Sequence, residues 1–247
     1  MGSMHDKSFP GESAAYRAAR DTLLAAEAAL RKQIEEVAAL RRALPPGGAV
    51  PCDYRFQAAP DGTPVLMSEL FEPGRDTLVL YSYMYGPQAP TPCPLCTSML
   101  DSLDGAAPHV AQHVNLAVVA RASADKLQAV AAQRGWRHLR LVSSCQNSYQ
   151  PDYLGEDETG NQRPMLNVFR RTERGLIHTW GSELLYAPRQ ARLHRRHVDL
   201  LWPLWTLPAL TPPVPGPPLP PPFQYPLPVP QPPPPPHTLH AAEHPPV

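Results

Sequence analysis

Two cysteines separated by two residues, Cys93 and Cys96, are the residues whose types and spacing most clearly indicate chemistry. They follow an apolar run, residues 77–84, that is predicted to be a buried strand, and they open a segment that is predicted to be helical. A helix N-terminus carries unpaired backbone N–H groups and the positive end of the helix dipole, and both favour a thiolate. The pattern therefore predicts thiol–disulfide chemistry, with Cys93 as the attacking thiol and Cys96 as the resolving thiol.

A cysteine pair of this spacing also occurs as half of a zinc site. A closed structural zinc site needs four ligands, and no second such pair is present, because Cys52 and Cys145 stand singly. The best histidine pair, His194 and His197, would lie on one face of a helix as metal ligands or a proton relay. Two surface histidines beside arginines are the simpler interpretation. Because thiolates suit soft metals, a protein that binds copper, haem or zinc stays open as an alternative.

The elements that must position the pair alternate between strands and helices. Alternation followed by a hairpin predicts a mixed sheet with helices on both faces. The predicted strands cover residues 54–56, 65–66, 77–81, 114–120, 138–142, 164–169 and 176–180, and the predicted helices after the first cover residues 98–107, 123–134 and 193–207.

The clearest helix is predicted over residues 13–44, where Ser13 can serve as its N-cap. Apolar residues recur along one seam in steps of three and four, but Arg20, Glu27 and Arg41 interrupt that seam. One interpretation is an amphipathic helix that lies over its own domain. The other is that part of the helix packs against a second subunit and makes a homodimer, and a non-catalytic dimeric interaction module is then a further alternative function.

A proline further along the chain supports the redox interpretation. In thioredoxin folds, the proline directly before the strand that enters the hairpin adopts the cis form and faces the cysteine pair. Pro164 holds that place here, although an ordinary trans proline that begins a strand would look the same. The combination predicts an α/β, thioredoxin-like mixed sheet with flanking helices, and it adds Pro164 to Cys93 and Cys96 as a catalytic residue.

The polar segment 143–162 follows a predicted strand, and α/β sheets present their sites at the carboxyl ends of strands. Within this segment, Asn147, Tyr149, Asp152 and Tyr153 are predicted to line a substrate cleft, while an ordinary solvated loop is the alternative. Cys145, in the same segment, is either a further redox partner or a partly buried free thiol. The predicted substrate-binding residues are Pro94, Leu95, Asn147, Tyr149 and Tyr153.

The charge balance and the composition limit which partners and which cellular compartment are expected. Lys plus Arg and Asp plus Glu each number 22, so no net field attracts nucleic acid, and no run of 18 apolar residues predicts a membrane span. Few cysteines and no apolar leader predict a cytoplasmic protein whose partner is a protein or small-molecule thiol or disulfide.

Nineteen of the 35 prolines lie beyond residue 207. The predicted organisation is a disordered N-terminus (1–12), a long helix (13–48), a thioredoxin-like domain (49–207) and a disordered Pro-rich tail (208–247).

The chain resembles a bacterial thioredoxin-like family of unknown function whose members are predicted to be dithiol–disulfide oxidoreductases. This resemblance implies a thioredoxin-like fold and a redox activity for Cys93 and Cys96. Members of that family often carry His where this chain has Ser82, so a role of that His in tuning the thiols or binding a metal is not carried over. The matching pieces are residues 16–21, 40–45, 86–87, 93–96, 135–137, 152–153, 164–169 and 197–205.

Overall fold

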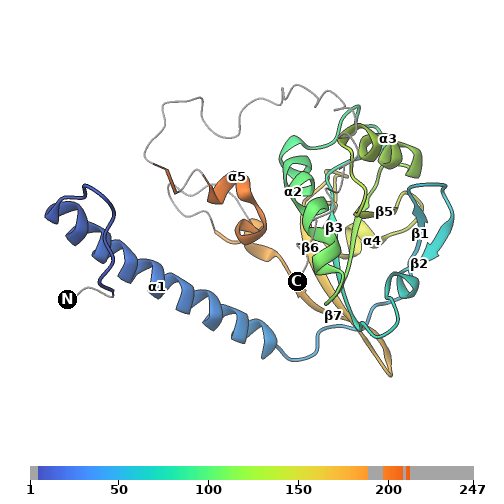
Figure 1. Cartoon of the computed structure of the whole chain (residues 1–247). Coiled ribbons are helices and arrows are strands. Elements are labelled where there is room, and N and C mark those ends of the chain that lie inside the picture. Colours follow the sequence, from blue (N-terminus) through green and yellow to red (C-terminus); the bar gives the residue numbers. More distant parts are fainter. Residues whose placement is uncertain (1–4, 189–196, 208–209, 212–247) are drawn as a thin grey trace, which may run out of the picture. The chain divides into compact units, whose positions relative to one another are not determined.

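A computed structural model describes residues 5–188, 197–207 and 210–211. The described residues of the unit formed by residues 1–210 contain a seven-stranded sheet of order β2-β1-β5-β4-β3-β6-β7 (Figure 1). The strands are β1 (Arg55–Ala58), β2 (Pro64–Leu66), β3 (Thr77–Ser82), β4 (Asn115–Ala120), β5 (Arg140–Ser143), β6 (Met165–Thr172) and β7 (Gly175–Gly181). The helices are α1 (Ala14–Arg42), α2 (Pro94–Val110), α3 (Ala124–Arg134), α4 (Tyr149–Asp152) and α5 (Pro203–Thr206), with 3-10 turns at Met67–Leu70, Glu183–Leu185 and Asp199–Leu201.

The centre of the sheet is a parallel unit in which α2 connects β3 to β4 and α3 connects β4 to β5. Such crossovers need a covering element, which explains why these strands are apolar on both faces. The hairpin of β6 and β7 pairs antiparallel with β3, and its turn uses Gly175 at φ +113°, a backbone conformation that favours glycine. The predicted mixed sheet with flanking helices is confirmed.

The sheet separates two apolar clusters, because successive side chains of a strand point to opposite faces. On β3, Tyr81 belongs to the cluster that also contains Cys96 of α2, and Leu80 belongs to the cluster that contains Tyr149 of α4. Each large apolar side chain that is fully buried in such a cluster contributes about 1.5–3 kcal/mol to stability. The face that a residue occupies therefore decides whether it can reach the cysteine pair.

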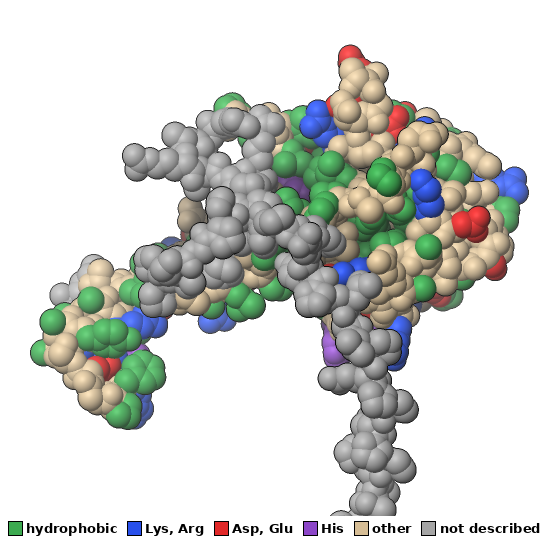
Figure 2. All heavy atoms as spheres, turned by 90° about the horizontal axis from the view of Figure 1, so that it is seen from above, with side chains coloured by type: hydrophobic (Ala, Val, Ile, Leu, Met, Phe, Trp, Pro, Cys, Tyr) green, Lys and Arg blue, Asp and Glu red, His purple; other side chains and the backbone are tan. Residues whose placement is uncertain are grey.

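The N-terminal helix α1 begins after Ser13, whose hydroxyl accepts a hydrogen bond from the Tyr16 backbone N–H, as the sequence predicts. No residue of α1 is buried, and apolar side chains lie on its surface (Figure 2). Its last turns do contact the sheet, where the Arg41 guanidinium lies 5.3 Å from the centre of the Trp180 ring. The amphipathic helix lying over its own domain and the homodimer therefore both stay predictions.

Three predicted segments differ from the structure. The helix expected at residues 98–107 begins at Pro94 and continues to Val110, because a proline is well tolerated at the first helical position. The segment 143–162 is not a continuous loop, since α4 lies within it. In the stretch 193–207, residues 193–196 lie outside the described part, and Pro203 begins α5 instead of ending a helix. Within the described residues, no helix is long and apolar enough to cross a membrane.

Candidate thiol site

Cys93 is the N-cap residue of α2, and Pro94 follows it at the first helical position. The Cys93 N–H donates to the Met84 carbonyl at 2.9 Å, which fixes the start of the helix beyond the carboxyl end of β3. The Cys93 carbonyl accepts from both the Thr97 N–H (3.0 Å) and the Thr97 hydroxyl (2.9 Å). The thiol of Cys93 is partly exposed, while Cys96, one turn into the helix, is buried.

The two thiols differ strongly in acidity. A hydrogen bond from the Cys96 thiol, aided by the backbone N–H groups of Cys96 and Leu95, lowers the pKa of Cys93 to about 6 against the opposing effect of burial. The same hydrogen bond, together with burial, raises the pKa of Cys96 well above its usual value. At neutral pH the outer sulfur is therefore a thiolate and the inner sulfur is a protonated thiol that donates to it.

Two tyrosines of the β3 end form the floor beneath the pair. The Tyr81 hydroxyl is buried with no hydrogen-bond partner among the described residues, and its interaction with the Cys96 thiol opposes the effects that raise the pKa of Cys96. Burial, followed by the charge of Cys96, raises the pKa of Tyr81 well above its usual value, so this phenol stays protonated. Tyr83 makes a 2.6 Å hydrogen bond to the Thr97 hydroxyl and secures the first turn of α2. The sequence did not single out these tyrosines, although their place in the strand before the pair is a usable signal.

The pKa of Cys93 makes a direct prediction about alkylation. Because the thiolate is the reacting form, the rate of Cys93 alkylation by iodoacetamide is expected to rise with pH, reach half its maximum near pH 6, and level off at neutral pH. Cys96→Ala removes the hydrogen bond that contributes most, so its midpoint is expected to move to higher pH. The measurement is the pH dependence of the rate, followed by peptide mass spectrometry, with Cys93→Ser as the control that lacks the signal. A wild-type midpoint above pH 8 would contradict the assignment.

Pro164 directly precedes β6, whose first residue, Met165, lies opposite Ser82 in the pairing with β3. Since β6 runs antiparallel to β3, Pro164 lies just beyond the carboxyl end of β3. The Cys93 N–H is bonded at this same end of the strand. The structure therefore brings the predicted proline and the predicted cysteine pair to one end of the sheet.

The C-terminal segment also packs against this site. His197 is buried, its Nδ1 is 2.8 Å from the Ser182 hydroxyl, and its ring stacks on Tyr81 with 6.4 Å between the ring centres. Burial lowers the pKa of His197 to about 4, so this ring is neutral at pH 7. Trp202 donates from Nε1 to the Ser98 hydroxyl at 3.0 Å and lies against α2. The sequence identified this stretch as amphipathic but did not place it over the thiol helix.

Of the predicted metal ligands, His194 lies outside the described residues, and His197 is the buried residue just described. The described part of the chain contains no cluster of three or more His, Cys, Asp or Glu residues that could hold a metal ion. Ser82 lies on the sheet face opposite Cys96, because it alternates with Tyr81 along β3. A residue at position 82 therefore does not share a face with the cysteine pair.

The predicted substrate residues are divided between two places. Pro94 is exposed and Leu95 is partly buried beside Cys93. Tyr149 is fully buried and Tyr153 partly buried in the cluster on the other face of the sheet. Asn147 is a loop anchor, since its Nδ2 donates to the Arg55 carbonyl at 2.7 Å. The structure thus brings Pro94 and Leu95 to the thiols but not Asn147, Tyr149 or Tyr153.

The remaining thiols lie apart from the pair. The Cys145 thiol donates to Gln57 Oε1 at 3.4 Å, beside the antiparallel pairing of β1 and β5. Cys52 is exposed in the segment before β1. In the order of the sheet, β5 and β4 lie between β1 and β3, and the cysteine pair follows the carboxyl end of β3. The fold therefore places neither Cys52 nor Cys145 at the start of α2, where the cysteine pair lies.

These features define the class: an α/β protein with a thioredoxin-like fold and a Cys-x-x-Cys pair at a helix N-terminus. A model of the family described as "Bacterial protein of unknown function (DUF899)" matches residues 6–214, and the chain belongs to this family. The search of curated protein sequences found no match.

Solved structures with some similarity to this chain include peroxidoxin BcpB from Mycobacterium tuberculosis, with 18% sequence identity and a TM-score of 0.42 over 55% of this chain and 86% of that one. An uncharacterized conserved protein from Geobacillus kaustophilus is 13% identical with a TM-score of 0.43, over 64% of this chain and 78% of that one. A structure of peroxiredoxin Q from Xanthomonas campestris is 17% identical with a TM-score of 0.40, over 55% and 84% respectively.

Proposed function

We propose that this protein is a thiol–disulfide oxidoreductase that uses Cys93 and Cys96. The observation that carries the proposal is the difference between the two sulfurs: a partly exposed Cys93 with a pKa of about 6 receives a hydrogen bond from a buried Cys96 thiol. A nucleophilic thiolate beside a protonated second thiol is the arrangement that stepwise exchange requires. The resemblance of the chain to a family of predicted dithiol–disulfide oxidoreductases agrees with this proposal.

The exchange has two balanced steps. The Cys93 thiolate attacks one sulfur of a substrate disulfide, forms a mixed disulfide and releases the other substrate sulfur as a thiolate. Cys96 then loses its proton and attacks the Cys93 sulfur, which releases the second substrate thiolate. The substrate disulfide gains two electrons, and the Cys93–Cys96 dithiol loses two electrons and becomes a disulfide. With a dithiol substrate the same steps run in reverse.

In this mechanism Tyr81 lies where it can assist the second step, because its hydroxyl stabilises the thiolate form of Cys96. Pro164 lies at the same end of β3, and we assign it a contact with the substrate that is bound at the cysteine pair. The substrate is a disulfide or dithiol on a protein or a small molecule, bound beside Pro94 and Leu95. A resident metal has no role in these steps.

The test is a count of free thiols before and after mild oxidation. Oxidation is expected to remove two of the four thiols, and dithiothreitol is expected to restore them. A variant with Cys52→Ser and Cys145→Ser should lose both of its remaining thiols in the same way. An alkylation pattern that oxidant leaves unchanged would exclude the proposed function.

A further inference from the structure

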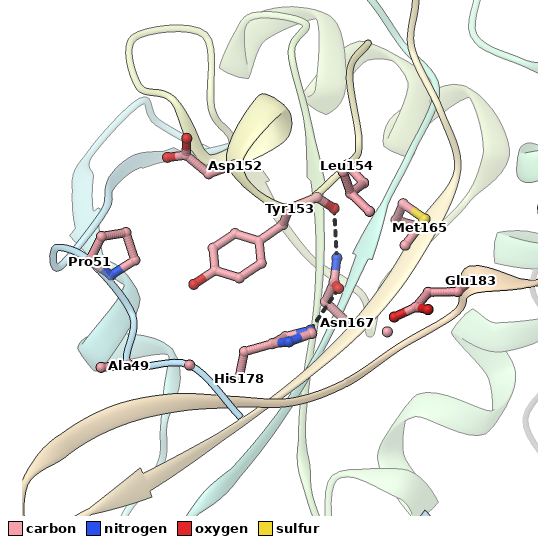
Figure 3. Close-up of a pocket in the computed structure, with 11 residues that line it drawn as sticks. Ala49, Pro51, Asp152, Tyr153, Leu154, Met165, Asn167, His178 and Glu183 are labelled. Atoms are coloured by element: carbon pink, nitrogen blue, oxygen red, sulfur yellow. Dashed lines mark hydrogen bonds between the residues drawn. The ribbon is translucent and has the colours of Figure 1, made fainter. Parts of the chain in front are cut away.

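A cavity of about 350 Å³ lies on the sheet face opposite the cysteine pair (Figure 3). Four segments that are far apart in the sequence contribute to its wall, which is lined by Gly48, Ala49, Pro51, Asp152, Tyr153, Leu154, Met165, Asn167, His178, Gly181 and Glu183. Asn167 at its floor pairs with Leu80 of β3 and shares the face of that residue. The volume is within the range of small-molecule sites, about 300–1,000 Å³. The proposed thiol exchange uses none of the residues that line this cavity.

The floor of the cavity is held rigidly by Asn167, which is only 2% exposed. Its Nδ2 donates to the Tyr153 carbonyl at 3.2 Å, and its Oδ1 is 2.9 Å from His178 Nε2. The rings of Tyr153 and His178 lie 5.4 Å apart, centre to centre, and both border the cavity (Figure 3). A Cβ atom at Gly181 would come within 3.0 Å of Asn167 Oδ1, so the absence of a side chain there leaves the floor undisturbed.

The backbone beside Tyr153 is also constrained. Leu154 lines the cavity with φ +60°, a conformation that costs a non-glycine residue free energy. Its carbonyl accepts a 3.0 Å hydrogen bond from the Tyr186 hydroxyl, which helps to hold that conformation. The cavity is therefore formed before any ligand enters, and binding would not have to order it.

The charged side chains that line the cavity are acidic. Its lining contains the carboxylates of Asp152 and Glu183 and no Lys or Arg among the described residues. Burial lowers the pKa of His178, so this ring is neutral at pH 7 and adds no positive charge. Asp152 already accepts hydrogen bonds from Tyr54 (2.7 Å) and Ser148 (2.6 Å).

Glu183 is the carboxylate that is available to a ligand, because its side chain makes no hydrogen bond or ion pair with a described residue. Asp152 and Glu183 border different sides of the cavity, and Tyr153 and Asn167 lie between them (Figure 3). An ammonium group is attracted by a free carboxylate, and an aromatic group packs favourably against an aromatic ring. We propose that this cavity is a binding site for a small organic cation, whose ammonium group pairs with Glu183 and whose aromatic part lies along the cavity toward the Tyr153 ring.

The proposal is tested by isothermal titration calorimetry on the full chain with three probes of similar size. Phenethylammonium carries the required charge, 2-phenylethanol is its neutral counterpart, and 3-phenylpropionate is an anion. Phenethylammonium is expected to bind at least about tenfold more tightly than the other two, a difference of about 1.4 kcal/mol. Added salt should weaken its binding, because screening reduces the attraction to exposed carboxylates.

Variants locate the site and separate it from the thiol chemistry. Glu183→Gln is expected to weaken phenethylammonium binding about tenfold, while Glu158→Gln, which changes an exposed carboxylate outside the cavity, is expected to have no effect. The double variant Cys93→Ser, Cys96→Ser should bind as the wild type does, whether or not the thiols exchange disulfides. No saturable binding at millimolar concentrations, equal binding of the anion, or an unchanged Glu183→Gln variant would each overturn the proposal.

Discussion

Cys96→Ser is expected to trap a covalent mixed disulfide between Cys93 and a substrate thiol, whereas Cys93→Ser is expected to form no adduct on Cys96. The reason is the division of roles between the two sulfurs. The Cys93 thiolate makes the first bond, and only the Cys96 sulfur lies where it can release the product from Cys93. Loss of the attacking thiolate should lower the exchange rate by at least about 10³-fold, since the covalent route is then closed.

The measurement uses a small aromatic disulfide, whose released thiol absorbs visible light, together with intact-protein mass spectrometry. All proteins in this assay carry Cys52→Ser, because the exposed Cys52 thiol would react with the disulfide as well. The protein with no other substitution should release two equivalents of thiol and end as the internal disulfide. Cys96→Ser should release one equivalent and gain the mass of one substrate half. Cys145→Ser is the matched control, because that thiol lies beside β1 and should leave the stoichiometry unchanged. An adduct that forms on Cys96 in the Cys93→Ser variant at the wild-type rate would reverse the assigned roles.

Asp104→Ala is expected to destabilise the fold strongly. Asp104 is a buried residue of α2 whose carboxylate accepts hydrogen bonds from the backbone N–H groups of residues 137, 138 and 139 at 2.8–3.2 Å. These bonds connect the helix that carries the thiols to the segment that leads into β5. Without the carboxylate the three donors lose their partner, so we expect a loss of about 3 kcal/mol in the free energy of unfolding.

Urea unfolding, followed by circular dichroism, measures this loss. Asp104→Asn keeps one acceptor oxygen and is expected to cost about 1 kcal/mol, because it loses only the charge-assisted part of the bonds. Glu158→Gln, at an exposed carboxylate, should leave stability within about 0.5 kcal/mol of the wild type. An alanine variant whose unfolding midpoint lies at the same urea concentration as that of the wild type would contradict this structural role of Asp104.

The network around Asp104 also explains the structural role of three consecutive residues, Gly135, Trp136 and Arg137. Gly135 ends α3 at φ +72°, and the Trp136 indole donates to Asp101 of α2 at 2.9 Å. The Arg137 N–H is one of the donors to Asp104. This motif therefore positions the thiol helix and does not itself do chemistry.

Several features of the fold followed from local sequence alone. The apolar run at 77–84, the hairpin around Gly175 and the helix ended by Gly135 were predicted correctly, because hydrophobic periodicity and capping residues act over a few neighbours. The spacing of Cys93 and Cys96 after a strand predicted a helix start, and Cys93 is the N-cap. The prediction placed the start of that helix four residues too late, because Pro94 was assigned to the turn before the helix instead of its first position.

Other features depend on which side chains share a face of the sheet. Tyr149 and Tyr153 were predicted to line a substrate cleft, yet they pack on the face opposite Cys96. Both tyrosines belong to α4 or directly follow it, and the face that this segment covers is decided by its contacts with distant rings such as Phe56 and Phe169. The sequence pattern identified these polar and aromatic residues, but it could not show on which side of the sheet they lie relative to the thiols.

The sequence by itself determined that the chain carries a Cys-x-x-Cys pair between a buried strand and a helix, with a proline ahead of a later hairpin. It did so because strands, helices and caps are specified by adjacent residues. Only the tertiary structure decided that Cys96 is buried against Tyr81 and that His197, about a hundred residues later, stacks on that tyrosine. Burial and hydrogen bonding set the pKa values of the thiols, and both arise from contacts between distant segments. The reactivity of the pair is therefore a property of the fold, while its existence is a property of the sequence.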